Sequence, residues 1–439
     1  MRRLALPGAL ALGALTMGAL ACGPGSGAGG SGGSLGIAGD SGGDGGSGGS
    51  TGGDGGGAGD ISGVGGGGGI GGVSGTGLGG DTATGVAGAT GGAGAGGGIA
   101  GDTGAGGGSG SGGGVAGSGG GGGDGTPATT LKSVAGPTDR LIGAALGAAH
   151  LAEPGYAAAA RHFNFATPEN EMKWDATEPA RNVFSFDRGD AIVTFAAQSG
   201  MQVKGHTLVW HSQLPPWVAA IQDATELRNA MINHITQVAL HFRGRVIAWD
   251  VVNEAVADGG GLRSSQFQQL LGARYLDDAF IAANAADPYA RLYYNDYGTE
   301  GLGAKSNYVY NLVKDMLARG VPIHGVGLQM HTGATDSPSA AEVAANMQRL
   351  AALGLDLMIT EMDVQICTGD LQAQSRRFHD IVAGCVAQPF CRAVTVWGVT
   401  DKYSWRNGQS CAAPRPLLFD DNYVPKPAYM GVINGFTGL

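Results

Sequence analysis

Residues 23–130 of this 439-residue chain contain no lysine, arginine or aromatic residue. Glycine dominates instead, because 60 of the 87 glycines precede residue 131. A segment of this composition cannot bury enough apolar surface to offset the entropy of its chain. We therefore predict that residues 23–130 form a disordered linker rich in Gly, Ser and Asp, which excludes a folded module from this part of the chain.

The chain also lacks an excess of basic residues. Its formal net charge is −10. Without two arginines near the start and seven aspartates of the linker, 24 basic residues face 29 acidic ones, which leaves −5. This balance gives no support for nucleic acid or an anionic surface as a partner. A neutral polymer is compatible with it.

The apolar run from Leu4 to Leu20 is short for a membrane span and glycines interrupt it. Two arginines precede this run and small residues end it, so residues 1–22 are typical of an export signal. The segment resembles a bacterial lipoprotein site in which Cys22 is acylated, although Ala19 stands where a leucine is usual. A plain secretory peptide and a membrane-spanning helix are the alternatives. We expect an exported protein, either a cell-surface lipoprotein or a secreted enzyme.

The five cysteines include no Cys-x-x-Cys pair, which disfavours a zinc site. Beyond Cys22 an even number remains, as expected for disulfides in an oxidising compartment. Cys385 and Cys391 are six residues apart and are predicted to close a small loop. Cys367 and Cys411 would then pair across two neighbouring loops.

Residues 131–439 are enough for one large α/β domain. Apolar runs that predict buried strands alternate with segments of helical periodicity, for example Leu227, Met231, Ile235 and Val238. The predicted strands are 141–145, 163–167, 202–206, 247–254, 291–296, 325–331, 355–363 and 393–398. The predicted helices include 187–198, 225–242, 275–286, 305–319, 340–353 and 371–385. Eight alternations predict a parallel sheet and favour a closed (β/α)8 TIM barrel over an open sheet.

Two glutamates, Glu254 and Glu361, each close a predicted buried strand, where an unpaired charge is costly. The chemistry of such barrels lies at the carboxyl ends of the strands. A pair of carboxylates acting on one substrate is what a glycosidase needs. Two structural carboxylates in unrelated salt bridges are the alternative. Polar residues at six strand ends favour the catalytic interpretation: His206, Asn253 with Glu254, Asn295 with Asp296, Gln329 with His331, Glu361 with Asp363, and Trp397.

Six motifs in order resemble family 10 of the glycoside hydrolases, whose typical members are endo-1,4-β-xylanases. The resemblance covers residues 140–437. Its motifs are Thr-Pro-Glu-Asn-Glu-Met-Lys-Trp-Asp (167–175), Gly-His-Thr-Leu-Val-Trp-His (205–211), Trp-Asp-Val-Val-Asn-Glu (249–254), Gly-Leu-Gln-Met-His (327–331), Ile-Thr-Glu-Met-Asp (359–363) and Val-Trp-Gly-Val-Thr-Asp-Lys-Tyr-Ser-Trp (396–405).

The resemblance implies that Glu254 is the general acid and base and that Glu361 is the nucleophile of a retaining mechanism. It also implies that His331 donates a hydrogen bond to Glu361 while Asp363 holds the imidazole. Asn253 would contact the 2-hydroxyl of the sugar, a bond that strengthens in the transition state. A core histidine is the alternative for His331. The resemblance further implies a cis peptide bond after His206.

The resemblance also implies a set of substrate-binding residues. Its polar members could instead form a charged turn, the tryptophans could belong to the core, and His206 and His211 could be metal ligands. No third ligand with suitable spacing accompanies the two histidines. The expected set is Glu169, Asn170, Lys173, His206, Trp210, Gln213, Tyr297, Gln329, Trp397 and Trp405.

We therefore expect a monomeric enzyme that binds xylan or xylo-oligosaccharides and uses no metal or other cofactor. Two alternatives remain. The same machinery could act on another β-1,4-glycan, such as cellulose or mixed-linkage glucan, or the protein could bind xylan without turnover. The presence of both Glu254 and Glu361 argues against binding alone.

Overall fold

The computed structural model describes residues 129–336, 338–367, 370–409, 411 and 413–439. The predicted export signal, Cys22 and the predicted linker as far as residue 128 lie outside these ranges. None of the helices in the described ranges combines the length and hydrophobicity needed to cross a membrane.

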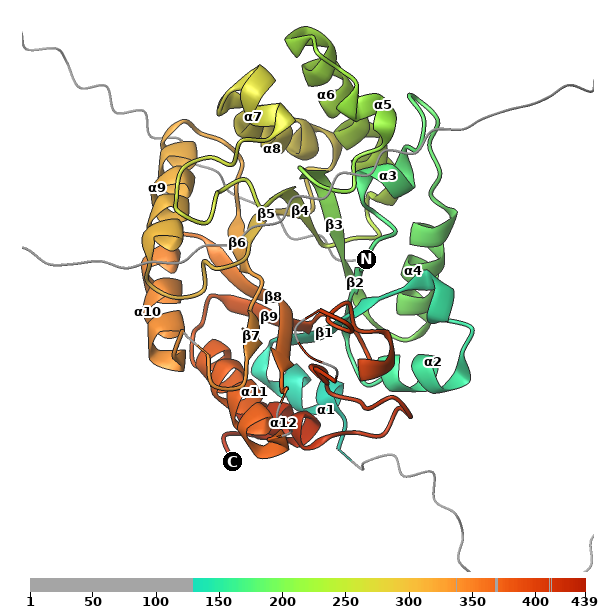
Figure 1. The fold of residues 1–439 in the computed structure, drawn as a ribbon, viewed down its shortest axis with the longest axis vertical. Helices are drawn as coiled ribbons and strands as arrows, with labels where there is room; N and C mark the ends of the chain where they lie inside the picture. Colours follow the sequence, from blue (N-terminus) through green and yellow to red (C-terminus); the bar gives the residue numbers. More distant parts are fainter. Residues whose placement is uncertain (1–128, 337, 368–369, 410, 412) are drawn as a thin grey trace, which may run out of the picture. The chain divides into compact units, whose positions relative to one another are not determined.

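Eight parallel strands close into a barrel, with helices around the outside (Figure 1). Each strand pairs with its neighbours in chain order, and the ring closes through the β1–β9 and β6–β8 pairings. The strands are β1 (Leu141–Leu146), β2 (Phe165–Pro168), β3 (Gln202–Trp210), β4 (Ala248–Asn253), β5 (Arg291–Asp296), β6 (Gly325–Leu328), β8 (Asp356–Gln365) and β9 (Cys391–Val396). The short strand β7 (His331–Gly333) follows β6 in the chain and, like β6, pairs with β8 in parallel. The predicted TIM barrel is confirmed, and each of the eight strands lies where the sequence places it, with ends shifted by a few residues.

The six helices predicted from periodicity are all present. They are α4 (Asp187–Gln198), α6 (Ala224–Phe242), α8 (Arg274–Ala286), α9 (Ala304–Ala318), α10 (Ala340–Ala351) and α11 (Leu371–Val386). The four apolar residues of α6 that define its period are completely buried, as an inward-facing stripe requires. Asp223 caps this helix by accepting a hydrogen bond from the backbone N–H of Glu226.

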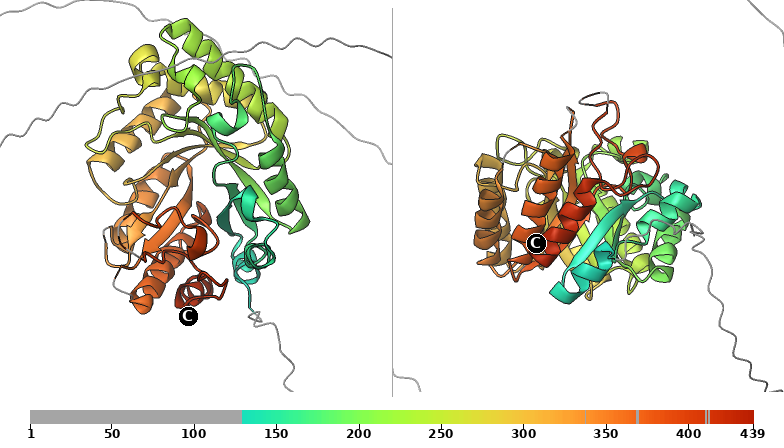
Figure 2. Two further views of the ribbon diagram at one scale, coloured as in Figure 1. Left: turned by 45° about the vertical axis from the view of Figure 1, so that its right-hand side comes forward. Right: turned by 90° about the horizontal axis from the view of Figure 1, so that it is seen from below.

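Further helices were not predicted. They are α1 (Leu131–Ala135), α2 (Pro154–Ala160), α3 (Trp174–Thr177), α5 (Pro216–Ala219), α7 (Gln266–Leu271), α12 (Pro427–Thr437) and the 3-10 turns η1 (Gly136–Thr138), η2 (Ala148–His150) and η3 (Asp401–Tyr403). The longest, α12, packs against α11 (Figures 1 and 2). A Cβ atom at Gly431 would lie 2.2 Å from the carbonyl oxygen of Ser375 in α11. Glycine there permits the close packing, although it weakens the helical pattern in the sequence.

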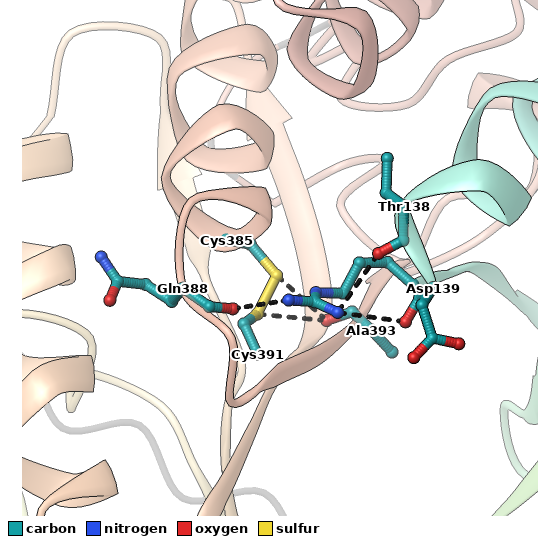
Figure 3. Close-up of a disulfide and its surroundings, with 7 residues drawn as sticks. Thr138, Asp139, Cys385, Gln388, Cys391 and Ala393 are labelled. Carbon is teal, nitrogen blue, oxygen red and sulfur yellow. Dashed lines mark hydrogen bonds between the residues drawn. A yellow bond between two sulfur atoms is a disulfide. The ribbon is translucent and has the colours of Figure 1, made fainter.

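Both predicted disulfides are present. Cys385–Cys391 closes the turn between α11 and β9 (Figure 3). Beside it, the Arg140 side chain donates a hydrogen bond to the carbonyl oxygen of Gln388 in the same turn (2.9 Å). Cys367–Cys411 joins the segment after β8 to the long connection between β9 and α12. That connection also carries Trp405, six residues before Cys411, and β8 carries Asp363, four residues before Cys367.

Candidate active site

A cleft of about 910 Å³ lies at the carboxyl ends of the barrel strands. All ten predicted sugar-binding residues line it, together with Asn253, Glu254, His331 and Glu361. Asp363 is completely buried behind His331. The cleft also extends over residues that the sequence did not indicate: Gly298, Glu300, Gly301, Leu302, Gly303, Pro338, Glu342 and Arg406.

Glu254 immediately follows β4 and has a φ of 56°, in the left-handed region. Its carboxyl group accepts three hydrogen bonds from uncharged groups. The indole nitrogen of Trp210 donates to one oxygen (2.9 Å), and the amides of Gln329 (3.0 Å) and Asn253 (3.3 Å) donate to the other. Glu254 is therefore oriented by neutral donors.

Glu361 lies within β8 and is 4% exposed. Its carboxylate accepts hydrogen bonds from the Asn295 amide (2.7 Å) and from His331 Nε2 (3.2 Å). Burial by itself raises the pKa of this carboxyl group, but the hydrogen bond from His331 and nearby positive charges outweigh it and hold the pKa of Glu361 below its ordinary value. Glu361 is thus ionised at neutral pH.

His331 is the charged partner of Glu361. Its Nδ1 contacts Asp363 at 2.8 Å. Burial disfavours the charged imidazole, but Asp363 and Glu361 outweigh this effect and raise the pKa of His331 to about 10. Both ring nitrogens are therefore protonated at neutral pH, and each donates to a carboxylate. Asp363 is held in turn by the Trp405 indole (2.8 Å) and the Arg406 guanidinium (3.0 Å). Arg406 directly follows the last of the six motifs but was not among the predicted site residues.

Uncharged side chains connect the two glutamates. Asn295 donates both to Glu361 and to the amide oxygen of Asn253 (2.9 Å). The amide of Gln329 donates to the same Asn253 oxygen (3.2 Å) and to Glu254. The sequence placed Asn295 at a strand end but indicated no role for it. Its position between Asn253 and Glu361 could not be predicted, because that position depends on the register between neighbouring strands.

His206 lies at the base of the cleft and is bonded to a buried ion pair. Its Nδ1 contacts Asp250 at 2.9 Å, and the same carboxylate oxygen accepts a hydrogen bond from Lys204. The side chains of Lys204 and Asp250 are fully buried. The peptide bond between His206 and Thr207 is cis, as the resemblance implied. A charged residue in the interior of each of the predicted strands 202–206 and 247–254 is the sequence signal that could have revealed this pair.

Polar side chains from the segments after β2 and β3 line part of the cleft. The Lys173 ammonium donates to Asn170 (2.9 Å) and Gln213 (2.7 Å) and lies 4.9 Å from the ring centre of Trp210. Burial raises the pKa of Glu169 to about 7, with Lys173 opposing the rise. These groups offer donors and acceptors to the hydroxyls of a sugar.

Tyr297 lines the cleft directly after β5. The ammonium group of Lys305 lies 3.3 Å from its ring centre, and the guanidinium carbon of Arg263 lies 5.8 Å from it. Its hydroxyl donates to Asp258 (2.6 Å). Behind it, burial raises the pKa of Asp296 to about 6.

The predicted tryptophans differ in exposure. Trp397 is 6% exposed and packs edge-to-face on His206 and His331, so it belongs partly to the core as well as to the cleft wall. Trp405 is 39% exposed. An indole that presents its face to a cleft can stack on the apolar face of a sugar ring.

A (β/α)8 barrel with two glutamates in a cleft at the carboxyl ends of its strands is the arrangement expected of a glycoside hydrolase. The family model of glycosyl hydrolase family 10 matches residues 130–435. The chain therefore belongs to glycosyl hydrolase family 10, and it is a glycosidase.

Similar proteins agree with this assignment. Endo-1,4-beta-xylanase B of Thermotoga neapolitana is 44% identical over 280 residues, which are 62% of this chain and 81% of that protein. An endo-1,4-beta-xylanase of Agaricus bisporus is 40% identical and covers 63% of this chain and 84% of its own length. The crystal structure of xylanase 10B from Thermotoga maritima has a TM-score of 0.69 and 41% identity, and the match covers 71% of this chain and 98% of that one. A structure of xylanase 10B from Thermotoga petrophila, in complex with xylobiose, has the same TM-score and 40% identity, with the same coverage.

Proposed function

We propose that this glycosidase is an endo-1,4-β-xylanase that hydrolyses internal β-1,4-xylosidic bonds of xylan by a retaining double displacement. Glu361 is the nucleophile, and Glu254 is the general acid and base. The observation that carries the proposal is the contrast between these two groups in one cleft. A charged imidazole, His331, holds Glu361 ionised, whereas the hydrogen bonds to Glu254 come from uncharged groups.

In the first step, a carboxylate oxygen of Glu361 attacks the anomeric carbon while Glu254 gives its proton to the glycosidic oxygen. The bond between that carbon and that oxygen breaks, and the shortened chain leaves as a neutral alcohol. A glycosyl ester of Glu361 remains. Asn253 contacts the 2-hydroxyl of the bound sugar and stabilises the oxocarbenium-like transition state.

In the second step, Glu254 is a carboxylate and takes a proton from water. The water oxygen attacks the anomeric carbon, the ester bond breaks, and Glu361 becomes a carboxylate again. Two inversions return the β configuration. Retaining enzymes hold the two carboxyl groups about 5–5.5 Å apart, whereas inverting enzymes leave room for a water between them at roughly 6.5–9.5 Å.

The cleft is lined by polar residues that follow β2, namely Glu169, Asn170 and Lys173, and by Tyr297, which follows β5. Binding groups from strands this far apart in the barrel support action within a chain. The xylobiose, xylotriose and xylotetraose in structures of related enzymes support xylan as the substrate class.

Release of reducing sugar from xylan, carboxymethyl cellulose and barley glucan tests the substrate. We expect release from xylan, with Glu361→Ala as the inactive control. Equal release from all three would point to a general β-1,4-glucanase, and no release despite retention on xylan would indicate a binding protein. Proton NMR of the first anomer formed tests the stereochemistry, and an α product would refute the retaining mechanism.

A further inference from the structure

The loop between β4 and α7 contains an arginine, Arg263, whose side chain turns back toward the end of β4. Its Nε donates to the main-chain carbonyl oxygen of Glu254 at 3.0 Å. Its Nη2 donates to the carbonyl oxygen of Val256 (3.2 Å) and to the hydroxyl of Tyr297 (2.9 Å). One guanidinium thus joins the backbone of the proposed acid to the aromatic residue at the end of β5.

The backbone of Glu254 needs such a partner. A residue with a side chain is strained at a φ of 56°, and this conformation persists only where the surroundings fix it. The N–H of Glu254 is fixed by the carbonyl oxygen of Asn295 (2.9 Å), and its C=O is fixed by Arg263. These two bonds set the direction in which the side chain leaves the backbone, and hence where the carboxyl group meets the substrate.

Arg263 acts from behind the cleft. Among the described residues it is not part of the cleft lining, and its side chain is 23% exposed. The nearest carboxylate, Asp258, lies 3.8 Å away and is bonded more closely to Tyr297 (2.6 Å) and Lys305 (3.2 Å). The directed hydrogen bonds of Arg263 therefore go to the Glu254–Val256 turn and to Tyr297. A planar guanidinium can hold these acceptors together in a way that a lysine ammonium cannot.

We propose that Arg263 is a positioning residue for proton transfer by Glu254. It holds the acid and Tyr297 in a fixed relation, so that a sugar seated on Tyr297 presents its glycosidic oxygen to the acid proton. The proposal rests on the proposed role of Glu254 as the general acid.

Leaving-group dependence separates positioning from a merely structural role. Cleavage of phenyl β-xylobioside requires a proton for the departing oxygen, whereas cleavage of 2,4-dinitrophenyl β-xylobioside requires almost none. The ratio kcat/KM reports only the steps through formation of the glycosyl ester. General acid catalysis contributes about 10²–10⁴-fold. We expect Arg263→Met to lower kcat/KM for the phenyl substrate by about 10–100-fold and for the dinitrophenyl substrate by less than about threefold.

Three further variants of the full chain complete the test. Arg263→Lys keeps the positive charge but lacks the planar guanidinium, so its kcat/KM for the phenyl substrate should lie between those of the wild type and Arg263→Met. If Arg263→Met does not fold, Arg263→Lys is compared with the wild type instead. Arg228→Met is the matched control, because Arg228 also donates two hydrogen bonds, but to Asp278 and not to the Glu254–Val256 turn or Tyr297. It should leave both kcat/KM values unchanged.

Glu254→Ala is the reference for loss of the acid. One outcome overturns the proposal for Arg263 and leaves the role of Glu254 intact. In it, Glu254→Ala keeps its kcat/KM for the dinitrophenyl substrate, whereas the Arg263 variants lower kcat/KM equally for both substrates or for neither. If Glu254→Ala lowers kcat/KM equally for both substrates, the proposed role of Glu254 as the general acid is itself refuted.

Discussion

Replacing His331 with glutamine tests whether a charged imidazole holds Glu361, the proposed nucleophile, in its ionised form. The wild-type imidazole has a pKa of about 10 instead of 6.5. This rise corresponds to roughly 5 kcal/mol of preference for the charged form in the folded protein. Its side chain is only 13% exposed, so solvent screens the two carboxylates weakly. Glutamine can donate a hydrogen bond to one carboxylate but carries no charge.

The sign of the pH dependence follows from the direction of this change. A group whose pKa is raised by folding contributes its full stability below the unfolded value, here 6.5, and loses it as the pH rises through the folded value, here about 10. The contribution should be roughly 5 kcal/mol at pH 6, roughly 3 kcal/mol at pH 8 and almost nothing at pH 10. His331→Gln should therefore have a lower free energy of unfolding than the wild type at pH 6. This difference, the stability gap, should shrink as the pH rises.

Urea unfolding of the full chain at these three pH values measures the gap. His241→Gln provides a control, because His241 forms a partly exposed pair with Asp190 (29% and 34% exposed). Loss of such a pair should change the free energy of unfolding by less than about 1 kcal/mol. A gap for His331→Gln that stays constant from pH 6 to pH 10, or widens, contradicts a charged imidazole in the native state.

Four other predictions address separate features. Glu361→Ala should abolish hydrolysis, and added azide should not restore a β-linked product, whereas Glu254→Ala should still cleave activated aryl xylosides and yield a β-glycosyl azide; exchanged behaviour would reverse the two roles. Glu169→Gln should raise the melting temperature at pH 8 but not at pH 4.5, because burial raises the pKa of Glu169 to about 7 and its ionised form is costly; an equal shift at both values would count against this account. Lys204→Met should lower the free energy of unfolding by about 3–5 kcal/mol in a urea titration, since it strands a buried carboxylate; a loss under about 1 kcal/mol would contradict this. Mass spectrometry of the protein from its native source should find a lipid on Cys22, and an unmodified enzyme free in the medium would exclude anchoring.

The barrel could be predicted because its strands and most of its helices are locally consistent. Apolar runs and period-3.6 patterns do not depend on distant residues, and eight alternations favoured the closed sheet. Helix α12 was missed for the opposite reason. Gly431 and Gly435 lower its helical propensity, and they are explained only by the backbone of α11 that approaches them. Helix α12 is therefore stabilised by its tertiary packing against α11, which a local sequence pattern does not show.

The same distinction applies to the site. Strand-end positions and the family resemblance led to the residues that line the cleft. Asp363, which holds His331, was expected from the resemblance. The roles of three other orienting groups were not found, because each is identified by a partner distant in sequence: Lys204 by Asp250, Arg406 by Asp363, and Asn295 by Asn253. A single sequence gives residue types but not these pairings.

The link between the glutamates has a consequence for enzyme engineering. Asn295, Asn253 and Gln329 form a spacer of amides, and amides do not titrate. The spacer should keep its length from acid to alkaline conditions, so the pH optimum could be retuned through the charged neighbours of each carboxylate without changing the stereochemical course. Shortening or lengthening an amide of the spacer, in contrast, would displace one carboxylate relative to the other and alter the geometry of attack before it altered any ionisation.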